Sequence, residues 1–388
     1  MKSFPKSFRT SSFLALAVAA ALAGCAATQD AGHSAMNMVK SATGQAQVVR
    51  QDVAPALYQV AYSPSEDVVY AVSAGNPKDP ASGVKSKLFK LDPETLAVKA
   101  EIELPKPGYG LTLDDEAHRL YIVDTRGGTL MVFDTTSSQV TASLTMPPVL
   151  DAQGKPEKIE YREIVVDKAN NRLYLPAMSY HDSKLQVVNL DTLTVERTIP
   201  GFNFGATGAS LDSAAGKLYV SNLMGQLFVV DIGTLAITDR FEVQGDQLLT
   251  LVMDHDNKRL LAVDEGFDRL NVVRKERGGL DYQPRTQGNQ VLALDPSSGK
   301  VLQNIKVGTQ PVDLLLDAPR NRLYVSNRVS GNISVVDPRT GQEIKTIDLP
   351  THPNSFALNP KTGTVYVTVK LPKEKSMTDK ESVARISF

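Results

Sequence analysis

The sequence predicts an all-β protein, a seven-bladed β-propeller of four-stranded antiparallel blades that is closed by pairing an N-terminal strand with the last blade. Three observations predict this fold. One unit of four short strands recurs seven times between residues 46 and 388. Asp, Asn, Gly and Pro turns separate the strands so closely that little room remains for helices. The seventh unit lacks a strand, and an unassigned alternating run precedes the first unit.

The second strand of each unit marks the repeat. It is a short apolar run centred on Tyr in six units and on Leu in one, with a mean spacing of about 49 residues. These central residues are Tyr70, Tyr121, Tyr174, Tyr219, Leu261, Tyr324 and Tyr366. An apolar strand and a polar turn precede each run. In six units a third strand follows and ends in an aspartate before a tight turn and a fourth strand; these are Asp92, Asp134, Asp191, Asp231, Asp295 and Asp337.

The ends of the repeat region predict how the ring closes. The seventh unit has only three strands after Pro353, the last of them running from Val383 to Phe388. The alternating run over residues 47–53 supplies the missing outer strand. Such closure leaves few free strand edges in the ring.

The N-terminal region predicts a signal peptide. Lys2, Lys6 and Arg9 precede an apolar run over residues 13–23 that is too short to span a bilayer. The run ends in Leu-Ala-Gly-Cys at Cys25, which resembles the lipobox of bacterial lipoproteins. That resemblance implies a diacylglycerol on the Cys25 thiol. The alternative is an ordinary signal peptide followed by a chance cysteine.

This interpretation divides the chain into three parts: a lipoprotein signal peptide (1–24), a lipidated flexible tether (25–45) and the propeller (46–388). The resemblance also implies that Ala26 directs the protein to the outer membrane. The predicted location is therefore the bacterial cell envelope, on the periplasmic side, with membrane contact only through the lipid anchor. The tether assignment rests on its Ala-, Ser-, Thr-, Gln- and Gly-rich composition.

Composition excludes several chemistries. One cysteine rules out an intramolecular disulfide, a Cys-rich zinc site, an iron–sulfur cluster and a CxxCH haem attachment. The absence of tryptophan argues against WD40 blades, tryptophan-docked quinoprotein blades and sialidase Asp-boxes in their usual form. No nucleophile elbow, P-loop or HExxH motif occurs. We therefore predict no cofactor and no metal site, and enzymatic activity is not the favoured hypothesis.

Two segments carry a family resemblance. Leu323 to Asn327 reads Leu-Tyr-Val-Ser-Asn and is followed by Ser-Val-Val-Asp at 334–337, which resembles the YVTN family of β-propeller repeats. Thr351 to Ser355, with the strand over residues 365–370, closely resembles YncE-type periplasmic propellers. The resemblance covers residues 46–388 and implies the fold, but this family has no motif that fixes a chemistry. The lipobox is a departure, since YncE-type proteins usually have a plain signal peptide.

The long connections are predicted to lie on one face of the ring. With the strands of a blade lettered A to D from the channel outward, B–C loops and D–A connections emerge on one face, here called the loop face. A–B and C–D turns emerge on the other, the turn face. The B–C loops of blades one, three, five and seven and the D–A connection over residues 146–160 are the long ones. Long loops on a rigid scaffold commonly carry function. Loop-face candidates are Tyr180, His181, Arg274, Arg277, Tyr282 and Arg285.

Polar residues recur at one position near the start of the innermost strands. The residues that follow this position are mostly apolar. We expect this position at the mouth of the central channel, toward the loop face. The candidate ligand-binding residues there are Gln59, Arg162, Glu163, Thr250, Asp313, His352, Asn354 and Ser355. Simple solvation of a wet channel mouth is the alternative. Glu163 and Asp313 fall on blades three and six, nearly across the ring, so direct contact between them is not expected.

These observations favour a lipid-anchored periplasmic binding protein that presents its loop face to a protein or small ligand. One alternative is a hydrolase or lactonase-like enzyme at the channel mouth that uses Glu163, Asp313, Arg162 and His352. Another is single-stranded nucleic-acid binding through the basic and aromatic insertion of blade five, residues 265–289. Acidic residues within that insertion favour a solvated hairpin instead, and the net charge of −1 argues against bulk electrostatic attraction to nucleic acid.

Overall fold

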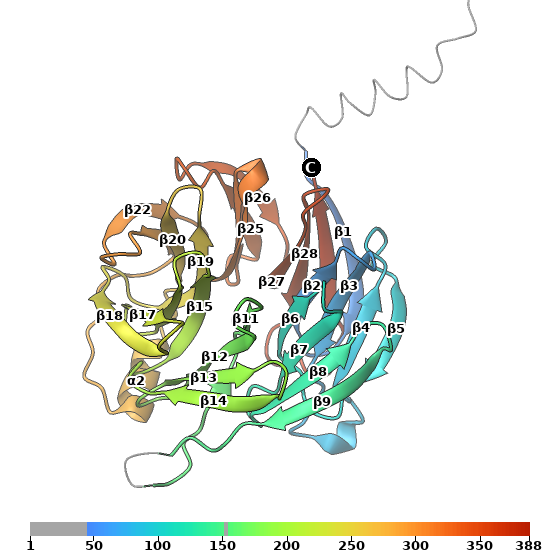
Figure 1. The fold of residues 1–388 in the computed structure, drawn as a ribbon. Coiled ribbons are helices and arrows are strands. Elements are labelled where there is room, and N and C mark those ends of the chain that lie inside the picture. Colours follow the sequence, from blue (N-terminus) through green and yellow to red (C-terminus); the bar gives the residue numbers. More distant parts are fainter. Residues whose placement is uncertain (1–44, 151–153) are drawn as a thin grey trace, which may run out of the picture. The chain divides into compact units, whose positions relative to one another are not determined.

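The computed structural model describes residues 45–150 and 154–388, which form a ring of seven antiparallel sheets around a central channel (Figure 1). Each sheet is one blade with the strand order A-B-C-D. The predicted all-β propeller with seven four-stranded blades is confirmed. The predicted signal peptide and the tether with Cys25 lie outside the described residues.

Consecutive strands build blades one to six. Blade one contains β2 (Leu57–Ser63), β3 (Val68–Ser73), β4 (Lys87–Leu91) and β5 (Val98–Glu103). Blade two contains β6 (Gly110–Asp114), β7 (Arg119–Val123), β8 (Thr129–Asp134) and β9 (Gln139–Thr145). Blade three contains β10 (Glu160–Tyr161), β11 (Val165–Asp167), β12 (Arg172–Met178), β13 (Lys184–Asn189) and β14 (Thr194–Ile199). Blade four contains β15 (Ala206–Asp212), β16 (Lys217–Asn222), β17 (Gln226–Asp231) and β18 (Ala236–Glu242). Blade five contains β19 (Leu248–Asp254), β20 (Arg259–Asp264), β21 (Gln290–Leu294) and β22 (Val301–Lys306). Blade six contains β23 (Pro311–Asp317), β24 (Arg322–Asn327), β25 (Asn332–Val336) and β26 (Glu343–Asp348).

Blade seven closes the ring. It consists of β27 (His352–Asn359), β28 (Thr364–Lys370), β29 (Glu381–Ser387) and β1 (Gln47–Ala54). The β1 strand pairs antiparallel with β29, from Gln47 opposite Ser387 to Asp52 opposite Ser382. Its last residues, Val53 and Ala54, are buried in the core between blades seven and one. The predicted closure by an N-terminal strand is confirmed.

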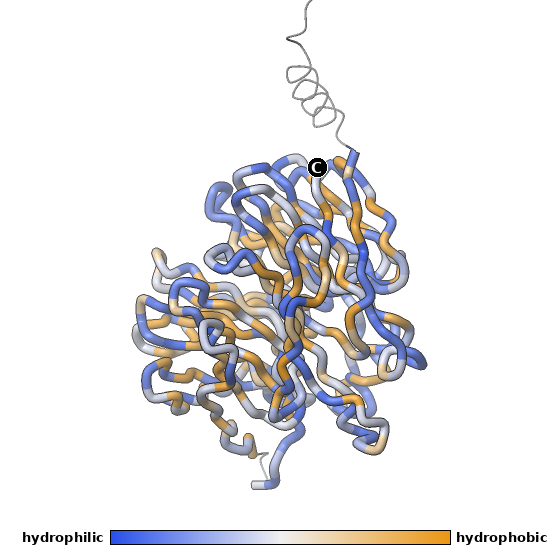
Figure 2. The backbone as a smooth tube through the Cα atoms, turned by 90° about the vertical axis from the view of Figure 1, so that its right-hand side faces the viewer, coloured by the Kyte–Doolittle hydropathy of each residue, from blue (hydrophilic) through white to orange (hydrophobic). Residues whose placement is uncertain are grey.

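The core lies between neighbouring blades. The B strands are buried along almost their whole length, and the tyrosines at their centres pack against the next blade. The D strands alternate between exposed and half-buried residues because they form the outer rim. Figure 2 shows apolar segments running through the blades and hydrophilic segments mainly at the periphery. Each repeat unit is therefore one blade, and both faces of its sheet are buried against the two adjacent blades.

The recurring aspartates form the turns that end strands A and C. The Asp114 carboxylate accepts a hydrogen bond from the backbone N–H of Ala117 at 3.2 Å at an A–B turn. At a C–D turn, the Asp134 carboxylate accepts one from Ser137 N–H at 2.6 Å. An aspartate that bonds to its own backbone two or three residues on stabilises a tight turn. In blade three Asn189, two residues before the predicted Asp191, takes this role and accepts from the backbone N–H groups of Asp191 and Thr192 at 3.0 Å. The side chains at this turn position therefore stabilise the fold.

The inner strands are bulged near their loop-face ends. In blades one, four, five, six and seven, strand A carries one extra residue relative to strand B. In blade three the strand is broken, and Arg162, Glu163 and Ile164 lie between β10 and β11, which both pair with β12. A bulge re-aims side chains that would otherwise alternate between the two sheet faces. The bulges fall at the predicted polar position.

Helix α2 (Leu270–Gly278) corrects one expectation, because the sequence favours a solvated hairpin for the blade-five insertion. The helix packs inward through Leu270 and Arg274, which are one helical turn apart and buried. The Arg274 guanidinium donates to Asp246 Oδ2 at 3.0 Å and lies 4.1 Å from the Tyr282 ring centre. Single 3-10 turns, η1 (Pro80–Ser82) and η2 (Ala318–Arg320), complete the described helical elements. None of these described helices is long and apolar enough to cross a membrane.

Candidate functional site

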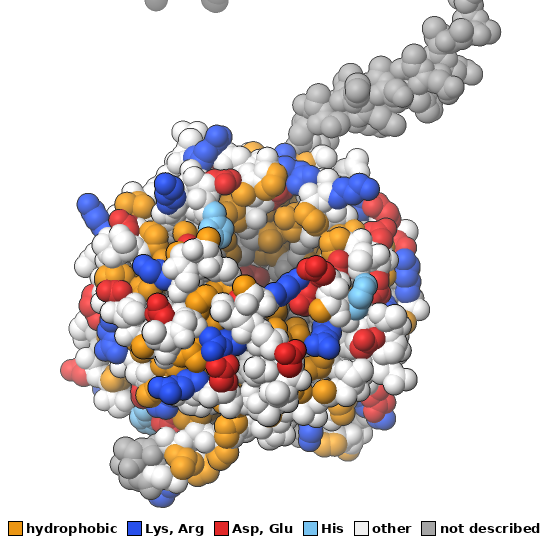
Figure 3. Space-filling view, viewed as in Figure 1, with side chains coloured by type: hydrophobic (Ala, Val, Ile, Leu, Met, Phe, Trp, Pro, Cys, Tyr) orange, Lys and Arg blue, Asp and Glu red, His pale blue; other side chains and the backbone are white. Residues whose placement is uncertain are grey.

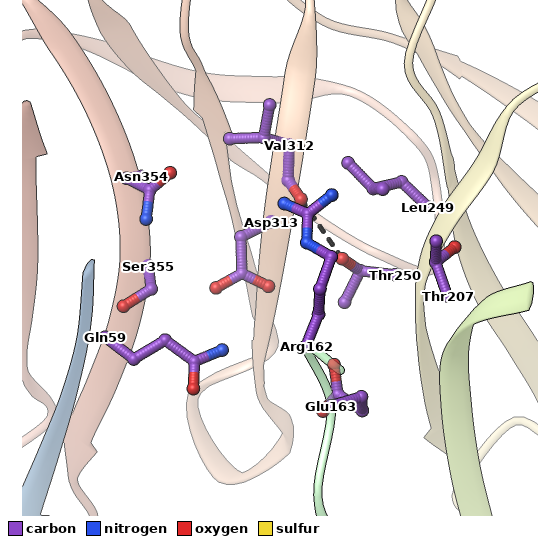
Figure 4. Close-up of a pocket in the computed structure, with 10 residues that line it drawn as sticks. All are labelled: Gln59, Arg162, Glu163, Thr207, Leu249, Thr250, Val312, Asp313, Asn354 and Ser355. Carbon is purple, nitrogen blue, oxygen red and sulfur yellow. Dashed lines mark hydrogen bonds between the residues drawn. The ribbon is translucent and has the colours of Figure 1, made fainter. Parts of the chain in front are cut away.

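An inner hollow lies in the channel at the bulges of the inner strands (Figure 4). Six of the seven blades contribute to it. It is lined by Gln59, Arg162, Glu163, Thr207, Leu249, Thr250, Val312, Asp313, Asn354 and Ser355. The structure thus brings together seven of the eight residues that the sequence nominated for the channel mouth. That they bind a ligand stays a prediction.

The bulges explain how consecutive residues reach one cavity. Residues next to each other in a regular strand point to opposite faces. Here Arg162 with Glu163, Val312 with Asp313, and Asn354 with Ser355 line the hollow as adjacent pairs. The extra residue in each inner strand releases the alternation at that point.

An outer hollow continues the inner one toward the loop face, with about 630 Å³ of empty space that is open to solvent. The two share Gln59, Arg162 and Asn354. The other lining residues are Tyr58, Tyr109, Gly110, Thr125, Arg126, Glu160 and Arg328. Figure 3 shows a face of the ring that is hollowed at its centre, with basic and acidic side chains around the opening.

Sequence reasoning did not nominate ten of the lining residues: Tyr58, Tyr109, Gly110, Thr125, Arg126, Glu160 and Arg328 in the outer hollow, and Thr207, Leu249 and Val312 in the inner hollow. Two signals point to some of them. Tyr58 and Tyr109 directly precede the aligned polar position, as Arg162 and Asn354 do. Arg126 and Arg328 follow the ends of the B strands β7 and β24, where short B–C loops turn beside the channel.

Two carboxyl groups in the inner hollow hold their protons unusually tightly. Burial is the main cause that raises the pKa of Glu163 to about 8, and the charge of Asp313 raises it further, while Arg162 opposes the shift. Burial also raises the pKa of Asp313 to about 7, against hydrogen bonds from the backbone N–H groups of Leu314 at 2.9 Å and Phe356 at 3.2 Å. Glu163 and Asp313 form no hydrogen bond with each other among the described contacts, as expected, but they share the cavity and influence each other electrostatically.

Cationic side chains line the two hollows: Arg162 lines both, and Arg126 and Arg328 line the outer one. In the described part of the chain, the Arg162 guanidinium has no hydrogen-bond or ion-pair partner, and Figure 4 shows it pointing into the inner hollow. Arg328 donates from Nη2 to Asn354 Oδ1 at 2.5 Å and lies in no ion pair of the described residues; burial lowers its pKa. Arg126, by contrast, lies 3.8 Å from Glu160 Oε1.

An aromatic pair borders the outer hollow. The rings of Tyr58 and Tyr109 meet edge to face with centres 4.5 Å apart. The Lys370 ammonium lies 3.8 Å from the centre of the Tyr58 ring and 3.0 Å from Glu381 Oε2. This wall therefore presents an apolar edge next to a cation whose charge is already paired.

The two histidines nominated from the sequence lie elsewhere. His352 has its Nδ1 atom 2.8 Å from the backbone oxygen of Arg328 and does not line either hollow. His181 is exposed, with Nδ1 3.3 Å from Glu157 Oε1. The hydrolase hypothesis joined His352 to Glu163, Asp313 and Arg162, and the structure does not assemble that set in one cavity. Within residues 45–150 and 154–388, no group of three or more His, Cys, Asp or Glu side chains is placed to hold a metal ion.

The structure changes the interpretation of the other loop-face candidates. Arg274 was expected on the loop surface, but its side chain is fully buried because it anchors α2. Arg285 pairs with Glu242 and donates to the Met224 carbonyl at 2.9 Å, and Tyr282 lies against both arginines. Tyr180 is half-buried beside Phe204, while Arg277 is exposed. The blade-five insertion therefore commits two of its arginines to contacts within the fold, which weakens the nucleic-acid alternative.

Comparison with known proteins places these observations among relatives. No family model matches the chain. The uncharacterized protein YncE of Salmonella typhimurium strain LT2 is 28% identical over 294 residues, which cover 74% of this chain and 75% of that protein. The uncharacterized protein YncE of Escherichia coli strain K12 is 27% identical over 307 residues, covering 72% of this chain and 85% of that protein. The resemblance to YncE-type propellers is confirmed, and the names of these relatives assign no activity.

Proposed function

We propose that the protein is a non-catalytic binding protein that takes a small ligand into the mouth of its channel on the loop face. One observation carries the proposal: bulged inner strands of five blades and the broken inner strand of blade three turn side chains into one hollow. A scaffold that needed only a filled channel would not require polar pairs there. The outer hollow is concave and open to solvent, and aromatic and polar side chains converge on it, features that small-molecule sites share.

We also propose that the protein is held at the periplasmic side of the bacterial outer membrane through a lipid on Cys25. The support is the lipobox-like Leu-Ala-Gly-Cys run and the sole cysteine at its end. The binding face would then be presented within the envelope, and the anchor would be the protein's contact with the membrane.

A ligand that copurifies with the protein tests the binding role. Native mass spectrometry of protein purified from its own host should detect a bound small molecule. Gln59→Phe should abolish that signal whatever the ligand's charge, because Gln59 lines both hollows and the ring would occupy the passage between them. Thr145→Phe is the matched control, since Thr145 is exposed on the outer strand β9. Equal ligand occupancy in both variants, with both folded by circular dichroism, would refute the proposed site.

A further inference from the structure

We infer that the ligand of this channel mouth carries a small anionic group, a carboxylate or a phosphate, which Arg162 and Arg328 bind, and that a proton enters the Glu163–Asp313 region when the anion binds. The inference rests on the proposed function and names the chemical class of its ligand.

Two guanidinium groups at the channel mouth lie in no ion pair of the described residues. Arg328 is half-buried, and its side chain donates to the neutral Asn354 Oδ1. A cation that is partly removed from water is normally paired, because its desolvation costs free energy. Arg162 is exposed and has no hydrogen-bond or ion-pair partner among the described residues, so its guanidinium is accessible to a ligand. Both line the outer hollow, and two guanidinium groups beside one hollow are suited to bind a carboxylate or phosphate.

Two other cations at this mouth are already paired. Arg126 lies 3.8 Å from Glu160, and Lys370 lies 3.0 Å from Glu381. Glu265 accepts a hydrogen bond from the neutral Gln310 Nε2 at 3.1 Å, and its charge raises the pKa of Arg328 and so partly offsets that cation. Arg162 and Arg328 are therefore the cations of the outer hollow that lie in no ion pair of the described residues.

The carboxyl groups of Glu163 and Asp313 line the inner hollow together with Arg162. The charged forms of Glu163 and Asp313 offset the charge of Arg162, whereas their protonated forms leave it uncompensated. An anion beside Arg162 is repelled by both carboxylates. Its binding therefore favours their protonated forms, and by linkage a lower pH strengthens its binding. Both groups titrate near neutral pH, so the coupling falls in an accessible range.

An aromatic wall of the outer hollow indicates what the rest of the ligand is like. The half-buried Tyr109 ring borders the outer hollow beside Tyr58. This apolar edge suits an organic anion whose charged end reaches Arg162. Inorganic phosphate would satisfy the arginines but leave the aromatic wall unused. Comparing an aromatic acid with inorganic phosphate therefore distinguishes the two sources of the anionic group.

Isothermal titration calorimetry tests the inference with benzoate, succinate and inorganic phosphate, and with benzamide and succinamide as neutral matches. At least one anion should bind while its amide does not. The Kd should weaken at least about fivefold from pH 6 to pH 9 because the carboxyl protons are lost. Titrations in buffers with different ionisation enthalpies should show net proton uptake by the complex.

Variants locate the effect. Arg162→Gln should weaken anion binding about tenfold or more, as expected when a charge-assisted contact is lost. Arg197→Gln, an exposed arginine on the outer strand β14, should bind as wild type. Glu163→Gln combined with Asp313→Asn should bind the anion with little of the pH dependence, whereas Glu163→Gln alone should keep the part that Asp313 supplies; a merely structural role would not produce this pattern.

The inference fails if no anion binds, if the amides bind as well as the acids, if Arg162→Gln changes nothing, or if no proton is taken up. A neutral copurified ligand that Gln59→Phe displaces would overturn the anion inference and leave the binding role intact. A ligand that Gln59→Phe does not displace would count against the binding role itself.

Discussion

At the scale of single residues, Glu163 is the group whose charge the fold changes most clearly within the site. It follows Arg162 in the break between β10 and β11, so both side chains enter the same hollow. The polar nature of this position was predictable because it recurs in five of the seven aligned inner strands. The raised pKa was not predictable, because it depends on burial and on Asp313, which lies 150 residues further along the chain.

Replacing this carboxyl by its neutral analogue should change how stability depends on pH. The pKa of Glu163 is about 8 in the folded protein and 4.5 in a free side chain, so the folded state binds the proton more tightly. Its contribution to the free energy of unfolding is complete below about pH 4.5 and is lost as the pH rises toward 8. Glu163→Gln should therefore gain about 2 kcal/mol relative to wild type between pH 5 and pH 9, a figure reduced because solvent reaches the half-buried group.

Urea unfolding at pH 5, 7 and 9 measures this difference. Glu374→Gln is the control, since Glu374 is exposed and should behave as wild type at every pH. A constant difference between Glu163→Gln and wild type across the three pH values would contradict the assigned proton affinity.

At the scale of elements, the strands were predictable and the bulges and the helix were not. Period-two patterns and Asp-based turns depend on local sequence, so they located the blades. The bulges depend on register between two strands, which leaves no local signature. The bulge between Leu57 and Val60 accompanies the entry of Tyr58 and Gln59 into the outer hollow, whereas Arg328 reaches it from the B–C loop after β24. Helix α2 is stabilised by the burial of Leu270 and Arg274 against neighbouring blades, a tertiary effect that overrides weak amphipathic patterning.

The closing strand β1 should contribute strongly to stability. Residues 47–52 are exposed, so burial of their side chains adds little. Their backbone pairs with β29, and the Arg50 guanidinium donates to Ser382 Oγ at 2.6 Å and to the Pro350 carbonyl. Deleting them leaves that edge of blade seven unpaired and should lower the free energy of unfolding by at least about 3 kcal/mol, since each backbone hydrogen bond contributes about 0.5–1.5 kcal/mol. Thermal and urea unfolding measure the change.

A double variant that keeps the backbone pairing is the control for this deletion. Val48→Thr with Val49→Thr alters two partly exposed side chains and should cost less than about 0.5 kcal/mol. If the deletion had no larger effect than the double variant, the pairing of β1 with β29 would not hold the ring closed.

At the scale of the whole molecule, the sequence predicted the ring, its closure and seven of the ten residues of the inner hollow. It did not predict the outer hollow or the burial of the Arg274 side chain, because both depend on which loops approach each other in the folded ring. The proposed anchoring at Cys25 also belongs to this scale, since it concerns where the propeller is held rather than how it is built.

Removing the thiol should release the protein from membranes. Wild-type protein expressed in its host should incorporate radiolabelled palmitate and partition into the detergent phase of Triton X-114, because an acyl chain adds about 0.8 kcal/mol of membrane affinity per buried CH₂. Cys25→Ser should remain unlabelled and enter the aqueous phase, while Ser41→Ala should behave as wild type. An unlabelled, aqueous wild-type protein would refute the lipoprotein assignment.

The closing strand also decides from which side the folded body can be held. Gln47 pairs with Ser387, where strand C of blade seven ends, so the chain enters the propeller on the turn face. The Tyr58–Arg328 entrance to the channel opens on the loop face, at the other end of the same strands. An attachment that precedes residue 46 therefore joins the ring on the side away from its opening. Such a protein can be fixed to a surface without its own support obstructing the path by which a solute arrives.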